Sequence, residues 1–130
     1  MTLYDSSVLI DYLAGRDAAV EYVASHVDER AVAPPLVLFE VYQGEVFKTG
    51  PTDLDAVDEA LTWLNVIETS AATARAAAAL QDELRTEGES LAARDAYIAG
   101  SAALRDERFV VADADFDADG ITGTLDVDFV

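Results

Sequence analysis

The chain has 130 residues, of which 52% are hydrophobic, and its 26 acidic residues against 8 basic ones give a formal net charge of −18. This length suits one domain with its own core, and the apolar content argues against intrinsic disorder. The absence of cysteine excludes disulfides and thiolate metal sites. No apolar run reaches the roughly 18 residues of a membrane span, and the start lacks the zones of a signal peptide. We therefore expect a single domain over residues 1–130, cytoplasmic, with no membrane partner.

The acidic excess is unusual, because Lys48 is the only lysine in the chain. A charge of this size destabilises the compact state through self-repulsion unless salt screens it. We interpret it as adaptation to molar salt, as in a halophilic organism. The alternative is an acidic docking face for a basic partner. The charge argues against broad electrostatic binding of nucleic acid at low salt, but it leaves open a nuclease whose metal ions meet the phosphates.

Hydrophobic patterning predicts strands and helices that alternate along the chain. The expected strands are residues 2–5, 30–33, 65–68 and 108–112, with another in the tail 125–130. The expected helices are residues 6–14, a short one from Asp17, 36–47, 54–64, 71–85 and 91–104. Such alternation implies a parallel sheet covered on both faces. The predicted fold class is therefore α/β, a three-layer α/β/α arrangement around a short-stranded central parallel sheet.

Asp5 stands at the end of the first predicted strand. In open α/β sheets, ligands bind in the crevice beyond the carboxyl ends of the strands. Asp is also a favoured N-cap, and local evidence favours that role for Asp5 at the start of helix 6–14. The two roles are compatible, because one carboxylate can serve both.

Glu40 and Asp95 each lie on a partly apolar face of a predicted helix. Glu40 has no lysine or arginine within a helical turn, and burying an unpaired carboxylate is costly; alternatively, it lies at the edge of the apolar stripe and reaches water. Asp95 shares its face with Ile98, and the alternatives for it are a cap or an ion pair with Arg94. Arg94 is expected to be solvated, with contact to a substrate phosphate as the less favoured interpretation.

Asp113 follows strand 108–112 as Asp5 follows the first strand, and it begins an acidic run that includes Asp115. The run ends in an Asp-x-Asp-x-Asp-Gly sequence at Gly120, which suggests a calcium loop. The Glu expected six residues later is replaced by Asp126, and the flanking helix pair is missing, so an EF-hand is not favoured. The ordinary interpretation of the run is an acidic surface turn.

Four segments resemble, in order, the motifs of the PIN domain family, in particular the VapC-type toxin ribonucleases of type II toxin–antitoxin systems. They are residues 4–11 (YDSSVLID), 39–44 (FEVYQG), 91–99 (LAARDAYIA) and 110–116 (VVADADF). The resemblance covers nearly the whole chain. The family often has Thr two residues before the fourth acid, where this chain has Val111, so Asp115 stays open as an alternative to Asp113.

The resemblance implies a PIN-like fold and an endoribonuclease that cleaves RNA phosphodiesters with a metal-activated water. Carboxylates without histidine suit Mg²⁺ or Mn²⁺. The expected metal ligands are Asp5, Asp95 and Asp113; Glu40 would coordinate the metal or orient the water, and Ser6 would hydrogen-bond to the cluster. These four carboxylates are the expected catalytic residues. The family also implies a small antitoxin protein that blocks the cleft, and a homodimer.

Two other functions stay open. One is a non-catalytic PIN-like binding module whose acidic residues serve salt tolerance and partner docking. The other is a DNA-cleaving relative. Tyr12, Tyr22 and Val23 on the first helices could form a partner interface, although packing within the monomer is the favoured interpretation for each of them.

Overall fold

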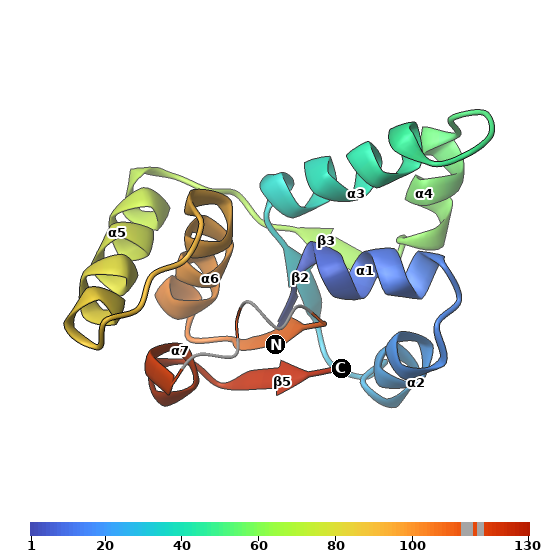
Figure 1. The fold of residues 1–130 in the computed structure, drawn as a ribbon. Coiled ribbons are helices and arrows are strands. Elements are labelled where there is room, and N and C mark those ends of the chain that lie inside the picture. Colours follow the sequence, from blue (N-terminus) through green and yellow to red (C-terminus); the bar gives the residue numbers. More distant parts are fainter. Residues whose placement is uncertain (113–115, 117–118) are drawn as a thin grey trace.

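The computed structural model describes residues 1–112, 116 and 119–130 (Figure 1). In chain order its elements are β1 (Thr2–Tyr4), α1 (Ser6–Leu13), α2 (Asp17–Ser25), β2 (Ala31–Ala33), α3 (Pro35–Phe47), α4 (Leu54–Ala60), β3 (Leu64–Val66), α5 (Ala71–Thr86), α6 (Ala93–Arg105), β4 (Arg108–Val111), α7 (Asp119–Thr124) and β5 (Val127–Phe129). In this part of the chain no helix is both long and apolar enough to cross a bilayer.

The strands form one parallel sheet in the order β3-β2-β1-β4-β5. Strand β1 lies at its centre, so the residue that follows it reaches the middle of the sheet's carboxyl edge. Helices α1 and α2 lie on one side of the sheet and α5 and α6 on the other (Figure 1). The predicted α/β class, with a central parallel sheet flanked by helices, is confirmed.

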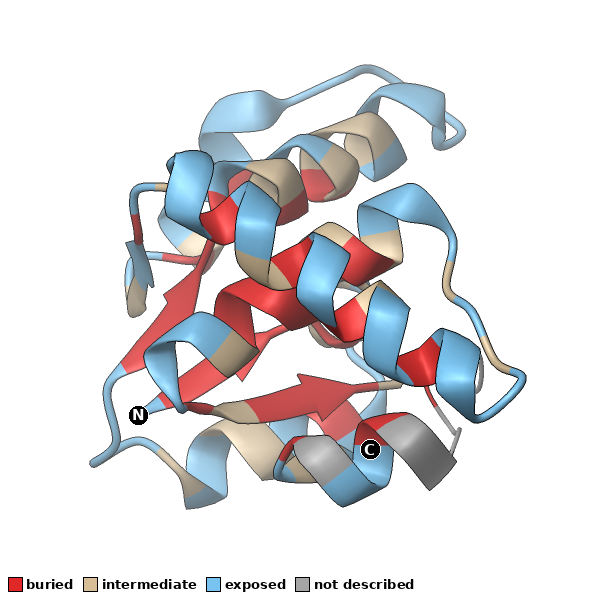
Figure 2. Cartoon of the chain, turned by 90° about the vertical axis from the view of Figure 1, so that its left-hand side faces the viewer, coloured by how far each residue is buried: buried red, intermediate tan, exposed pale blue. Residues whose placement is uncertain are grey.

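The core lies where the helices cover the sheet. The central strands are buried along most of their length (Figure 2). Leu3, Val32, Phe109 and Val110 are fully inaccessible to solvent. Parallel strands covered on both faces are typically continuous apolar runs, which explains why β4 was clear in the sequence.

The predicted helix 54–64 extends too far. Helix α4 ends at Ala60, and Leu64 begins β3, where it pairs with Ala31 of β2. The apolar spacing suggested one continuous helix, but pairing with the neighbouring strand takes the last residues into the sheet. Tertiary context overrides local propensity here.

Helix α6 begins at Ala93, two residues after the predicted start. The side chain of Gln81 explains the difference, because its Nε2 donates to the Leu91 carbonyl at 2.6 Å and its Oε1 accepts from the Leu91 N–H at 3.0 Å. Helix α7 was not predicted, because its segment was interpreted as part of an acidic turn. Ile121 at its centre is fully buried, so packing of one apolar side chain accompanies the helix.

Helices α5 and α6 cross closely at Ala77 and Gly100. A Cβ atom added at Gly100 would lie 2.6 Å from the Ala77 Cα atom, closer than real side chains approach. The alanine run 76–79 was interpreted as a close-packing face, and Ala77 fits that interpretation. The close crossing holds α6, and with it Arg94 and Asp95 of its first turn, against the rest of the domain.

Candidate catalytic site

Asp5 occupies the predicted position at the carboxyl end of β1. Its backbone N–H donates to the Val110 carbonyl at 2.9 Å, which continues the β1–β4 pairing to this residue. The chain then turns into α1 with extended backbone at Asp5, and the Asp5 Oδ2 atom accepts a hydrogen bond from the Ser7 N–H at 3.1 Å. Asp5 is thus the N-cap of α1, as predicted, and only 3% of it is exposed.

Ser7 connects this carboxylate to the end of β4. Its hydroxyl donates to the Asp5 Oδ2 atom at 2.5 Å and accepts from the Ala112 N–H at 3.0 Å. The sequence analysis considered Ser6 and missed Ser7. The available signal was the pair of hydroxyl residues directly after Asp5, but only the tertiary structure shows that the second one reaches β4.

Glu40 projects from α3 toward the same place. The Ser6 hydroxyl donates to its Oε1 atom at 3.2 Å, and the Arg94 Nη1 atom lies 3.2 Å from its Oε2 atom. The Glu40 side chain is 15% exposed and that of Arg94 is 63% exposed. Arg94 was expected to be solvated; most of it is, but its guanidinium also pairs with Glu40. No local pattern could reveal this contact, because the two residues lie far apart in the sequence.

The environment of Asp5 disfavours its charged form. Burial is the largest cause and raises the pKa of its carboxyl above the usual 3.8, and the charge of Glu40 raises it further. The hydrogen bonds from Ser7 act in the opposite direction and only partly compensate. A buried carboxylate beside a second carboxylate is the arrangement that a bound cation would stabilise.

Asp95 lies in the first turn of α6 and is partly buried. The contact between Arg94 and Glu40 brings this turn close to α3. The predictions for Asp113 and Asp115 fall outside the described residues. Among the residues that are described, no group of three His, Asp or Glu side chains could hold a metal ion, so Asp5, Glu40 and Asp95 alone do not form a closed ligand set. The four-carboxylate site therefore stays a prediction.

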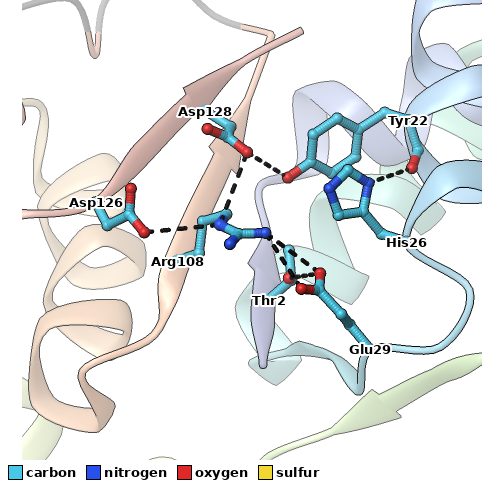
Figure 3. A network of polar contacts seen from close by, with 7 residues as sticks. All are labelled: Thr2, Tyr22, His26, Glu29, Arg108, Asp126 and Asp128. Atoms are coloured by element: carbon cyan, nitrogen blue, oxygen red, sulfur yellow. Dashed lines mark hydrogen bonds and ion pairs between the residues drawn. The ribbon is translucent and has the colours of Figure 1, made fainter.

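A second polar cluster lies at the amino ends of β1 and β4, away from Asp5 (Figure 3). The Arg108 guanidinium lies 3.3 Å from Glu29, 3.6 Å from Asp126 and 3.8 Å from Asp128. The Tyr22 hydroxyl also donates to Asp128, at 2.6 Å. These contacts connect β5 to β4, to α2 and to the segment before β2, and we assign the cluster a structural role.

The residues considered for a partner interface pack within the monomer. The Tyr12 ring lies 5.3 Å from that of Trp63, and the Tyr22 ring stacks on His26 at 4.0 Å. Val23 packs against the core. His26, the only histidine in the chain, accepts or donates a hydrogen bond at the Tyr22 carbonyl, 2.7 Å away. These side chains explain how α1 and α2 are held to the domain.

Comparison with known proteins agrees with the predicted resemblance. The model of the PIN domain family matches residues 2–119. No curated protein matches the sequence significantly.

Solved structures share the fold at low sequence identity. One is VapBC2 from Rickettsia felis bound to a DNA fragment from their promoter, with 17% identity, a TM-score of 0.83, and coverage of 98% of this chain and 97% of that chain. Another is FitAcB from Neisseria gonorrhoeae, with 19% identity, a TM-score of 0.81 and coverage of 100% and 97%. A third is a toxin–antitoxin complex from Klebsiella pneumoniae, with 24% identity, a TM-score of 0.75 and coverage of 92% and 94%.

Proposed function

The chain belongs to the PIN domain family, and we propose that it is a divalent-cation-dependent endoribonuclease that acts as the toxin of a toxin–antitoxin pair. One observation carries the proposal: the buried carboxylate of Asp5 lies at the centre of the sheet's carboxyl edge, with the charge of Glu40 close enough to raise its pKa. Keeping two carboxylates together in a buried place is costly for stability, and cation binding is a function that would explain it.

The available donors fit Mg²⁺ or Mn²⁺. Both ions prefer hard oxygen ligands, and Asp5, Glu40 and the Ser6 hydroxyl supply only oxygen. We assign Asp5, Asp95 and Asp113 as cation ligands, directly or through water. Glu40 would coordinate the cation or orient the attacking water. The order of these residues along the chain matches the order of the family motifs, which supports the assignment.

The bound cation would lower the pKa of a water molecule and stabilise charge on the phosphoryl oxygens during in-line attack. The protein's own groups supply positioning. Glu40, held by Ser6 and Arg94, is placed to orient the attacking water or accept its proton. Ser7 holds Asp5 in one orientation. No covalent enzyme intermediate is required. Asp115 is the alternative to Asp113 as the fourth carboxylate.

We also infer a small antitoxin protein as partner and a homodimer as the assembled toxin. Support for the partner comes from the similar fold of a chain in the toxin–antitoxin complex from Klebsiella pneumoniae. A gene for a short protein immediately upstream would strengthen this inference. Light scattering of the purified protein at high salt tests the dimer directly, and a monomer at micromolar concentration would contradict it.

The activity test compares RNA and single-stranded DNA as substrates in high KCl, with Mg²⁺, Mn²⁺ or EDTA. We expect cation-dependent cleavage of RNA that is lost in D5N and E40Q. The matched control is D55N, which removes the same charge from an exposed position at the start of α4. Mn²⁺ binding that persists unchanged in D5N would show that Asp5 is not part of a cation site.

The alternatives predict different outcomes in the same assay. A DNA-cleaving relative would cut the single-stranded DNA in preference to RNA, with the same dependence on Asp5. A non-catalytic module would cut neither substrate under any cation condition. In that case the acidic surface would serve salt tolerance and partner docking.

A further inference from the structure

Arg94 is a basic side chain in direct contact with the acidic cluster. Its Nη1 atom lies 3.2 Å from the Glu40 Oε2 atom. The two partners differ in exposure, because the Arg94 side chain is 63% exposed and the Glu40 side chain only 15%. The guanidinium therefore covers a largely buried carboxylate from the solvent side, and it can leave without opening the core.

We propose that Arg94 is an exchangeable counter-ion of Glu40 that becomes a phosphate contact for RNA when a divalent cation binds at the cluster. This inference rests on the proposed function. When the cation supplies positive charge to Glu40, the guanidinium loses its electrostatic reason to remain there. Its planar set of N–H donors matches the geometry of a phosphate and can bind it with two parallel hydrogen bonds.

The charge of the whole chain makes this position important. At a formal net charge of −18, most of the surface repels an RNA backbone. A positive side chain at the rim of the cluster would counter that repulsion where the scissile phosphate must lie. Arg94 also belongs to the same helical turn as Asp95, one of the proposed cation ligands. The exchange therefore couples cation binding to substrate binding within one turn of helix.

A purely structural role for Arg94 makes a different prediction. If its contact served only to hold α6 against α3, removing it would lower stability without improving cation affinity. Two measurements separate the roles, and both use the full chain with the variants R94A and R94K. The matched control is R85A, because Arg85 is an exposed arginine paired with Asp82 on α5, away from the cluster.

The first measurement is Mn²⁺ affinity by isothermal titration calorimetry. We expect R94A to bind Mn²⁺ about twofold to fivefold more tightly than the wild type, the range for loss of a partly exposed competing ion pair. R94K, which keeps the charge, and R85A should both resemble the wild type. Unchanged or weaker Mn²⁺ binding by R94A would overturn the inference.

The second measurement is the affinity for a fluorescein-labelled single-stranded RNA by anisotropy, with Ca²⁺ replacing Mg²⁺ and a gel to verify that the RNA stays uncut. We expect R94A to bind about tenfold more weakly than the wild type. The slope of log affinity against log salt should fall by about 0.7, as for the loss of one phosphate contact. A slope equal to that of R85A, or wild-type binding no tighter with Ca²⁺ than with EDTA, would contradict the proposal.

D5N distinguishes failure of this inference from failure of the proposed function. If D5N retains both Mn²⁺ binding and RNA cleavage, the proposed catalytic site itself is wrong. If D5N loses both while R94A behaves like R85A in both measurements, the site stands and only the role of Arg94 is wrong.

Discussion

The Ser7 hydroxyl donates a hydrogen bond of 2.5 Å to the carboxylate of Asp5. The same hydroxyl accepts from the Ala112 N–H, so the start of α1 and the end of β4 are joined through one oxygen atom. The residue after Ala112 is Asp113, the fourth expected carboxylate. Ser7 therefore connects the first and last motifs of the predicted site.

Replacement of Ser7 by alanine should destabilise the protein by about 1–3 kcal/mol, because it leaves the Ala112 N–H without this acceptor. Urea denaturation at fixed salt measures the change. S25A is the control, since the Ser25 hydroxyl donates to the Glu21 carbonyl at an exposed position, and we expect it to cost less than about 0.5 kcal/mol. Equal effects of the two substitutions would show that the bridge contributes little.

Asp5→Asn should stabilise the cation-free protein by roughly 1 kcal/mol, as substitutions that relieve strained functional sites often do. Asn caps a helix about as well as Asp, so the main change is removal of a buried charge. Thermal unfolding in EDTA tests this expectation. On addition of Mn²⁺ the melting temperature of the wild type should rise while that of the variant should not. A variant that is less stable than the wild type in EDTA would argue against an unfavourable charge at this position.

The stability difference between the wild type and D5N should depend on pH. Burial raises the pKa of folded Asp5 above its ordinary value of 3.8. A raised pKa means that protonated Asp5 contributes stability in full below the ordinary value, and that this contribution is lost as the pH rises through the folded-state pKa. The advantage of D5N in EDTA should therefore be largest near neutral pH and shrink on acidification toward 3.8. A constant difference over this range would contradict the assignment.

Gly100→Ala should destabilise the protein by about 1–3 kcal/mol, although alanine is the better helix former. The added methyl group would meet the Ala77 backbone where α5 and α6 cross. Gly123→Ala is the matched control, because a Cβ atom there meets nothing within 4 Å, and it should be neutral or stabilising by up to about 1 kcal/mol. Chemical denaturation of both variants gives the comparison. Similar stabilities would mean that the helices separate easily.

Arg108→Gln should lower stability by about 1–2 kcal/mol, because it leaves Glu29, Asp126 and Asp128 without their shared cation. The loss should be greatest in low salt, where repulsion among carboxylates is least screened. Hydrogen exchange should show increased opening of β5, which these contacts attach to β4. Unchanged exchange in β5 would show that backbone pairing alone holds that strand.

The melting temperature should rise steeply with KCl, because the formal charge of −18 is poorly screened in dilute buffer. The screening length falls from about 10 Å at 0.1 M salt to about 3 Å at 1 M. Sucrose at equal osmolarity serves as the control for general solute exclusion and should have a smaller effect. A melting temperature independent of KCl would contradict adaptation to salt.

Local pattern was sufficient for much of the fold. Apolar runs and helical spacing located the strands and helices because the period of side-chain burial is a local property. Asp5 could be identified as both a cap and the end of a strand for the same reason. The end of α4 at Ala60 and the start of α6 at Ala93 could not be located, because pairing with β2 and the side chain of Gln81 decide them.

The sequence by itself determined the α/β class, the order of the acidic motifs and the excess of negative charge, all of which depend on residue identity and spacing along the chain. Only the tertiary structure decided that Ser7 reaches Ala112 and that Arg94 reaches Glu40. Each of these contacts joins residues far apart in the sequence, so it exists only when packed helices and strands bring the two side chains within hydrogen-bonding distance.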